Sequence, residues 1–171
     1  MRNVAIYVDG QNLYHAARAR QRMPDYEAIL HHCQGLLAEQ AGEPVEFTHC
    51  RIYVISANRA LGFIQALQGM GYEVLDYLRR SRSDTFTWST QIVLDVSSAA
   101  RLHGVEHIAV ASGDGNLSVL RGELERELGD LAPTLQVVGF PGTISQRWGV
   151  SEELPSSCLY KPERNTHDRR T

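Results

Sequence analysis

Two aspartates stand where short apolar segments give way to polar residues. Asp9 follows the apolar run 4–8, and Asp114 follows the apolar run 108–111 after a serine and a glycine. Runs this short, bounded by glycine-containing turns, are typical of buried strands. A residue just past the C-terminal end of a strand in a parallel α/β sheet faces the ligand crevice. The two carboxylates are therefore predicted to share one site; the alternative for Asp9 is that it only caps the helix that follows.

A third aspartate lies inside a predicted helix. Asp95 falls in the segment 89–103, which has a helical apolar pattern. The residues of its buried face are Ile92, Val96, Ala99 and Ala100. Asp95 borders that face, so its carboxylate would lose hydration and require a partner. The partner is either structural, a backbone amide or an arginine, or functional, a metal ion.

The segments that would position these aspartates alternate between strand and helix along the chain. Further strands are predicted at 49–56, 72–78 and 135–139, and helices at 11–22, 26–40, 58–69 and 117–128. This alternation predicts a three-layer α/β fold, with a mainly parallel sheet of about five strands and helices on both faces. One domain is expected over residues 1–160, with a short strand or helical turn within 147–159. Residues 161–171 are expected to form a flexible charged tail.

The composition excludes several classes of protein. The net charge is −3, which is not that of a generally basic nucleic-acid binder. No apolar run of about 18 residues occurs, and the predicted first strand leaves no room for a signal peptide, so no membrane association is expected. Three widely spaced cysteines without a CxxC pair favour reduced thiols in a cytoplasmic protein. A P-loop lysine motif and a G-x-S-x-G elbow are both absent from the sequence.

Positive charge and aromatic rings suggest where a nucleic acid would bind. The arginines cluster as Arg18, Arg20 and Arg22 after the first helix and as Arg79, Arg80 and Arg82 after the strand 72–78. Either cluster can hold phosphates beside an acidic centre, and the alternative is a solvated surface. Tyr14, Trp88 and Trp148 can stack on unpaired bases, although single aromatic residues in helices more often pack in the core.

The two aspartate segments resemble those of the NYN domain, a PIN-like nuclease family that includes the bacterial LabA-like proteins. Val8-Asp9-Gly10-Gln11-Asn12 resembles the V-D-x-x-N pattern of the family, and Ser112-Gly113-Asp114-Gly115-Asn116-Leu117 resembles its S-G-D-S-D-F pattern. Asp95 resembles an aspartate in the helix after the family's K-G-V-D-V motif. Ser89 stands where the aspartate of that motif would fall, and Asn116 replaces the second aspartate of S-G-D-x-D.

The resemblance extends over residues 4–159 and implies a PIN-like, Rossmann-like fold that hydrolyses phosphodiester bonds with Mg²⁺ or Mn²⁺. Single-stranded RNA is the expected substrate. The residues implied to be catalytic are Asp9, Asn12, Asp95 and Asp114, of which Asp9, Asp95 and Asp114 would hold the metal ion. Those implied to bind substrate are Asn12, Ser112, Asn116, Arg79, Arg80 and Arg82. The alternative is a catalytically weakened module that binds RNA or a protein and regulates it, and pairing into a homodimer is left open.

Overall fold

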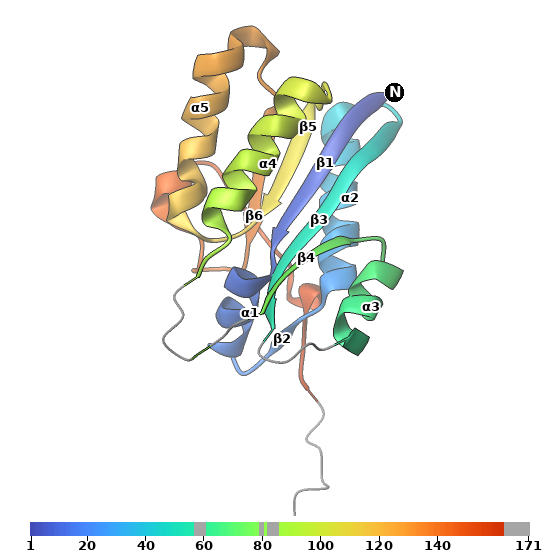
Figure 1. The fold of residues 1–171 in the computed structure, drawn as a ribbon, viewed down its shortest axis with the longest axis vertical. Helices are drawn as coiled ribbons and strands as arrows, with labels where there is room; N and C mark the ends of the chain where they lie inside the picture. Colours follow the sequence, from blue (N-terminus) through green and yellow to red (C-terminus); the bar gives the residue numbers. More distant parts are fainter. Residues whose placement is uncertain (57–60, 79–80, 82–85, 163–171) are drawn as a thin grey trace, which may run out of the picture.

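The centre of the molecule is a six-stranded sheet in the order β4-β3-β1-β5-β6-β7, and every neighbouring pair is parallel (Figure 1). The computed structural model describes residues 1–56, 61–78, 81 and 86–162. The strands are β1 (Arg2–Asp9), β3 (Val45–Ser56), β4 (Glu73–Leu78), β5 (His107–Ala111), β6 (Thr134–Gly139) and β7 (Glu152–Glu153). The predicted parallel α/β fold is confirmed, and β7 adds a strand to the five expected.

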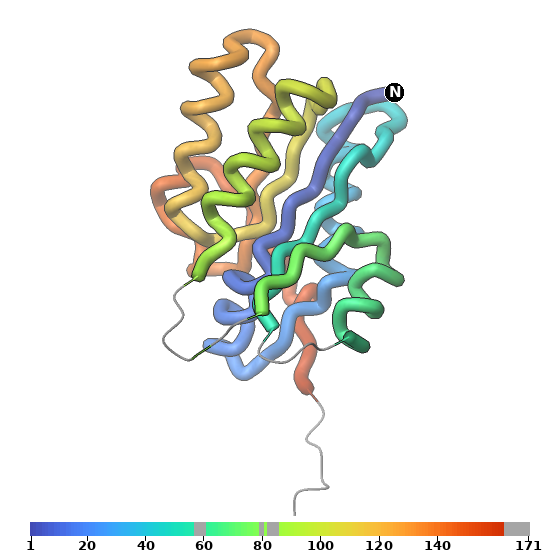
Figure 2. The backbone as a smooth tube through the Cα atoms, viewed as in Figure 1, coloured from blue at the N-terminus to red at the C-terminus, as the bar shows by residue number. Residues whose placement is uncertain are grey.

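Five α-helices in the described part of the chain cover the two faces of this sheet. They are α1 (Gly10–Arg18), α2 (Tyr26–Ala41), α3 (Leu61–Gly69), α4 (Ser89–Leu102) and α5 (Val119–Leu128). Helices α1, α2 and α3 pack on one face, while α4 and α5 lie side by side on the other (Figures 1 and 2). The sheet is therefore the middle layer of three, as the alternating pattern predicts.

The core is divided between the two faces of the sheet. Val8 and Ile6 on β1 pack on one side with Ile29 of α2, whereas Tyr7 packs on the other side with Ile92 of α4. Because both faces of β1 are covered, its sequence is a continuous apolar run rather than an alternating one. Among the helices that the structure describes, none is long and apolar enough to cross a membrane.

Several boundaries differ from those that the sequence predicts. Helix α1 ends at Arg18 instead of Arg22, because Gln21 adopts a left-handed conformation at φ 56° and the Arg22 N–H closes back onto Ala17 O at 3.1 Å. The helix predicted from residue 117 begins with a 3-10 turn, η1 (Gly115–Ser118), before α5. Asp25 caps α2 as predicted, since its carboxylate accepts the Ala28 N–H at 3.0 Å.

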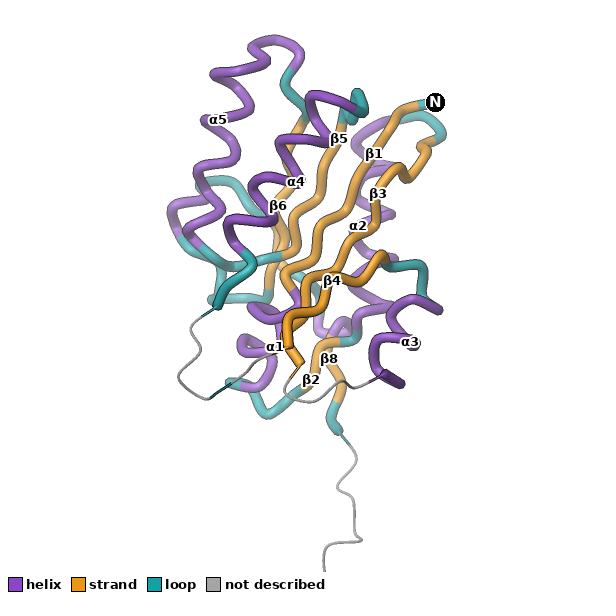
Figure 3. Tube along the Cα trace, viewed as in Figure 1, coloured by secondary structure: helices purple, strands orange, loops and turns teal. Residues whose placement is uncertain are grey.

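The C-terminal part of the described chain returns to the start of α2. Strand β2 (Met23–Pro24) pairs antiparallel with β8 (Leu159–Tyr160), which forms a second, two-stranded sheet (Figure 3). Short turns η3 (Gln146–Trp148) and η4 (Ser156–Cys158) precede it, as expected for the segment 147–159. The predicted tail lies largely outside the described residues, which end at residue 162.

Candidate functional site

The site lies where the path of the chain through the sheet changes direction. After β1 the chain builds β3 and β4 on one side, and it then returns to build β5 and β6 on the other side. Strands β1 and β5 are parallel neighbours, so their C-terminal ends form the crevice in which α/β folds bind ligands. Asp9 is the last residue of β1, and Asp114 follows β5 by three residues. The sequence-based prediction that both aspartates reach this edge is confirmed.

Ser112 links the two aspartates. Its hydroxyl group donates a hydrogen bond to Asp9 Oδ2 at 3.1 Å and accepts one from the Asp114 N–H at 3.1 Å. One carboxylate oxygen of each aspartate caps a helix: Asp9 Oδ1 accepts the Asn12 N–H at 3.0 Å, and Asp114 Oδ1 accepts the Asn116 N–H at 2.9 Å. Capping and a shared site are therefore not exclusive, because each carboxylate has two oxygens and uses only one for its helix.

Two further side chains hold this arrangement in place. Asn12 Oδ1 accepts the Gly113 N–H at 2.8 Å, which fastens α1 to the turn after β5. Ser89, at the start of α4, donates its hydroxyl proton to Asp114 Oδ2 at 2.7 Å. Three segments of the chain that are distant in sequence, the starts of α1, α4 and η1, thus meet around Asp9 and Asp114.

Asp9 is the most strongly perturbed group of the site. It is only 5% exposed, and burial raises its pKa from 3.8 to about 6. The charge of Asp114 also raises the pKa, while the hydrogen bonds from Asn12 and Ser112 lower it. Among the described residues no arginine, lysine or histidine forms an ion pair with Asp9 or Asp114. The site therefore carries negative charge that this part of the protein does not neutralise.

The donor set fits a hydrated divalent cation held by two carboxylates. Mg²⁺ prefers oxygen ligands, retains several of its waters, and is usually bound through one or two carboxylates together with substrate phosphates. Asp9 and Asp114 supply such oxygens beside the Ser112 hydroxyl group. Within the described residues, no group of three or more His, Cys, Asp or Glu side chains is arranged to hold a metal ion. A larger protein cage is therefore not part of the described site.

Asp95 has partners of its own, and they favour the structural alternative for this residue over a place at a shared ion. Tyr53 donates its hydroxyl proton to Asp95 Oδ2 at 2.6 Å, and Arg51 Nη1 lies 3.3 Å from the same oxygen. Gln91, one turn earlier in α4, donates to Asp95 Oδ1 at 2.7 Å. Unlike Asp9 and Asp114, Asp95 thus has a cationic partner on β3, which is the structural alternative that the sequence left open.

This Asp95 network also fixes the state of a buried tyrosine. Burial, and then the hydrogen bond to Asp95, raise the pKa of Tyr53, so its hydroxyl group stays protonated and donates to the carboxylate. Sequence reasoning did not identify Arg51, Tyr53 or Gln91. The available signal was the spacing of Arg51 and Tyr53, which are two residues apart on a strand and so face the same side of the sheet.

The remaining predicted residues are placed unevenly. Asn116 is exposed at the start of η1, where its side chain is accessible to a ligand. Trp148 is buried, and Trp88 donates its indole N–H to Val54 O at 2.9 Å, so both pack in the fold, whereas Tyr14 is exposed on α1. Arg79, Arg80 and Arg82 lie outside the described residues, and their role in substrate binding stays a prediction.

Comparison with known proteins agrees with this geometry. A family model described as the NYN domain matches residues 3–146. The crystal structure of a protein of unknown function from Vibrio parahaemolyticus is similar to this chain with a TM-score of 0.72 and 25% sequence identity, over 93% of this chain and 96% of that one. Among curated proteins, none was found that matches the chain. The family match includes β1, β5 and both aspartates of the crevice, and the chain belongs to the NYN domain family of the PIN-like nuclease superfamily.

Proposed function

We propose that this protein is a ribonuclease that hydrolyses phosphodiester bonds of single-stranded RNA with Mg²⁺ or Mn²⁺. The observation that carries the proposal is the pair Asp9 and Asp114, joined through Ser112 at the switch point of the sheet and not neutralised by a cationic residue of the described chain. The charge of Asp114 raises the pKa of Asp9, so the two carboxylates repel each other. A divalent cation reverses this repulsion, which supports its binding here.

Each residue of the site has a distinct role in this proposal. A bound ion would supply a water of lowered pKa and neutralise charge on the phosphate oxygens. Asp9 and Asp114 would hold the ion, and Ser112 fixes the Asp9 carboxylate relative to the backbone of Asp114. Asn12 uses its carbonyl oxygen on the Gly113 N–H, which leaves its amide nitrogen to donate to a phosphate oxygen. Asn116 is exposed beside Asp114, where it can position the substrate.

A second candidate function is RNA binding without cleavage. The observation in its favour is Ser89, whose hydroxyl group satisfies Asp114 Oδ2 at the position where the family pattern carries an aspartate. With Asp95 held by Arg51, the described site has two carboxylates rather than three or four. A site of this kind can bind a cation and RNA while hydrolysing the strand slowly.

The test of the proposed function is cleavage of end-labelled single-stranded RNA with Mn²⁺ and with EDTA. Wild type is expected to cleave only with the ion, and Asp114→Asn is expected to lose at least about ten-fold in rate because it removes one ion-binding carboxylate. Asp130→Asn, an exposed substitution in the turn η2 (Gly129–Leu131), is the matched control and should cleave like wild type.

Three results of this assay separate the candidates. Ion-dependent cleavage that Asp114→Asn loses supports the ribonuclease. RNA binding by wild type without any cleavage supports the regulator instead. Equal cleavage by wild type and Asp114→Asn would place the activity elsewhere and overturn the assignment of the site.

Substitution of Asp95 tests its structural role. Asp95→Asn is expected to cleave RNA within about three-fold of wild type but to lower the free energy of unfolding by about 1–2 kcal/mol, because it removes the charged partner of Arg51 and Tyr53. Cleavage rates and urea denaturation measure the two effects separately. A loss of cleavage as large as that of Asp114→Asn, with unchanged stability, would return Asp95 to the ion site.

A further inference from the structure

A cavity of about 810 Å³ lies beside α1, next to the acidic crevice. Its wall includes Gly10, Gln11, Tyr14, Tyr26, Phe63 and Tyr160. Sites for small organic ligands usually measure roughly 300–1,000 Å³ and combine apolar walls with a few polar groups. We infer that this cavity holds an unpaired nucleobase of the same RNA strand whose phosphate binds at Asp9 and Asp114. The inference rests on the proposed function and adds to it a contact that selects unpaired RNA.

The position of the cavity links it to the acidic site. Gly10 lines the cavity and directly follows Asp9 in the chain. The cavity also borders Val54 and Ile55 at the end of β3, the strand that pairs with β1 on the side away from β5. Neighbouring strands are about 4.8 Å apart, so the cavity and the crevice lie on adjacent strand ends. A single strand of RNA that places a phosphate at Asp9 therefore has a base within reach of the cavity.

The walls offer aromatic faces. Tyr14, Phe63 and Tyr160 are 39%, 42% and 48% exposed, so their rings are accessible to a ligand. The ring of Phe63 lies 6.1 Å from that of Tyr26 at an interplanar angle of 57°, and the Tyr26 hydroxyl group is fixed by its hydrogen bond to Gly10 O at 3.0 Å. Unpaired bases bind proteins mainly by stacking on such rings.

The polar groups of the cavity suit a neutral, planar ligand better than an ion. Asp25, a carboxylate in the lining, is engaged as the cap of α2 through the Ala28 N–H at 3.0 Å. Gln11 adds a side-chain amide, which can both donate and accept hydrogen bonds at the edge of a base. His15 adds an imidazole to the lining. A largely apolar cavity with an amide and an imidazole matches a nucleobase, whose faces are apolar and whose edge is polar.

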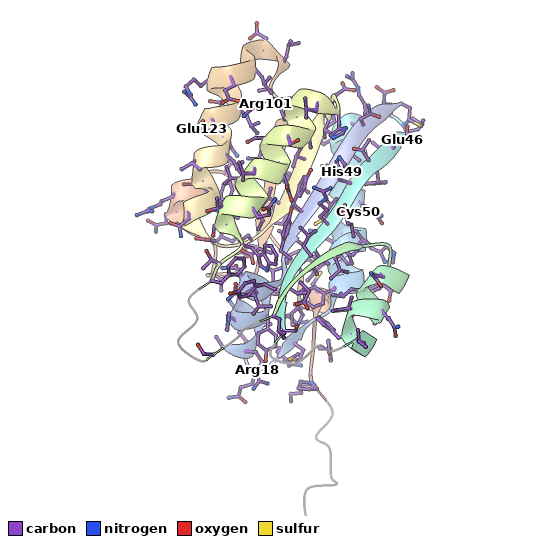
Figure 4. All side chains as sticks on the ribbon, in the orientation of Figure 1. Arg18, Glu46, His49, Cys50, Arg101 and Glu123 are labelled. Atoms are coloured by element: carbon purple, nitrogen blue, oxygen red, sulfur yellow. The ribbon has the colours of Figure 1, made fainter. Side chains whose placement is uncertain are left out.

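Helix α1 also carries a guanidinium group, that of Arg18, on the same side as two residues of the cavity wall. Gln11, Tyr14 and Arg18 are spaced three and four residues apart, so they lie along one strip of the helix. Figure 4 shows Arg18 at the end of the molecule where α1 lies, opposite the end that carries Glu46 and Arg101. An amide, a ring and a guanidinium group along one strip can contact the edge of a base, its face and the next phosphate.

Binding of labelled RNA to the Asp114→Asn protein, in which cleavage is suppressed, tests the inference. Fluorescence anisotropy with Mn²⁺ measures the affinity for a short single strand and for a series of strands that each carry one abasic nucleotide. Phe63→Ala and Tyr14→Ala, added to this background, are each expected to weaken binding of the intact strand about five-fold or more. This loss should disappear for the strand whose abasic nucleotide falls at the cavity, because no base remains there to stack.

Two controls separate base stacking from structural damage. Tyr14→Phe keeps the ring and should retain the affinity that Tyr14→Ala loses. Leu94→Ala removes an exposed apolar side chain from α4, on the other face of the sheet, and should bind every strand as the parent does. Thermal denaturation of each variant shows whether the fold is maintained.

The outcomes distinguish this inference from the proposed function. If wild type cleaves RNA but the cavity variants bind all strands like the parent, the inference is overturned and the ribonuclease stands. If the variants weaken intact and abasic strands equally, the cavity holds no base and the inference is overturned. If wild type neither binds nor cleaves RNA, the proposed function fails, and the inference fails with it.

Discussion

Replacing Asp9 by asparagine is expected to stabilise the metal-free protein at pH 7.5 by up to about 3 kcal/mol while reducing RNA cleavage about 100-fold or more. Burial raises the pKa of Asp9 from 3.8 to about 6, a difference of roughly two pK units, each worth about 1.4 kcal/mol. Asparagine has nearly the same shape and keeps a carbonyl oxygen for the Asn12 N–H, so the cap is preserved. The negative charge of Asp9 thus lowers the free energy of unfolding of the metal-free protein, and the same charge would hold the ion.

The pH dependence gives the sign of this effect. The folded protein binds the Asp9 proton more tightly than the unfolded chain does, so this contribution to stability is complete below about pH 3.8 and is lost as the pH rises through about 6. Wild type should therefore lose about 2–3 kcal/mol relative to Asp9→Asn between pH 4 and pH 7.5. Urea denaturation of both proteins in EDTA at these two pH values measures the difference.

Addition of Mn²⁺ at pH 7.5 completes the experiment. The ion should raise the unfolding temperature of wild type, because it binds the folded state, and should leave that of Asp9→Asn nearly unchanged. Asp130→Asn, beyond the end of α5 that is distant from the site, is the control and should follow wild type in both measurements. If the free energies of unfolding of wild type and Asp9→Asn changed in parallel with pH, the pKa of Asp9 would not be raised in the folded state. The prediction would then be contradicted.

A second large effect is expected from Gly113→Ala. A Cβ atom at this position would overlap the carbonyl oxygen of Thr143 and lie 3.0 Å from its carbonyl carbon. The obstacle is backbone rather than a flexible side chain, so the turn must move, at a cost of about 2–3 kcal/mol or more. The same shift would disturb the Gly113 N–H bond to Asn12 and the Ser145 N–H bond to Gly113 O. Cleavage should therefore fall together with stability.

Gly122→Ala is the matched control for this substitution. Gly122 lies in α5, where a Cβ atom would meet nothing within 4 Å. Alanine is a better helix former than glycine, so this variant should be more stable by up to about 1 kcal/mol. Urea denaturation and cleavage assays of the two variants compare the same chemical change in open and in crowded surroundings. Equal stability of Gly113→Ala and wild type would show that the contact with Thr143 relaxes at little cost.

The sequence predicts those parts of the site that follow from the order of strands and helices along the chain. Asp9 and Asp114 each follow a buried apolar run, and parallel strands bring such positions to one edge of the sheet. The hydroxyl link through Ser112 is a consequence of the same arrangement, since the serine precedes Asp114 by two residues. Local pattern and fold class were sufficient for this part.

The sequence could not predict contacts that depend on how distant elements face each other. The partners of Asp95 are an example, because the pattern of α4 shows that Asp95 borders the apolar face but not which strand residues lie beneath it. Arg51 and Tyr53 lie there, and they satisfy the carboxylate without a metal ion. The contact of Gly113 with Thr143 is of the same kind, because the turn that carries Thr143 is placed by β6 rather than by its own sequence.

Asp9 is at once the last residue of β1 and the cap of α1, and α1 carries Gln11 and Tyr14 of the neighbouring cavity. The Asp9 carboxyl group is therefore bonded directly to the first turn of that helix. If binding of the cation shifts this carboxyl group, the cation and the base would alter each other's affinity by the same factor. A cation bound at the end of β1 would in this way change the affinity of the cavity beside α1 for a base.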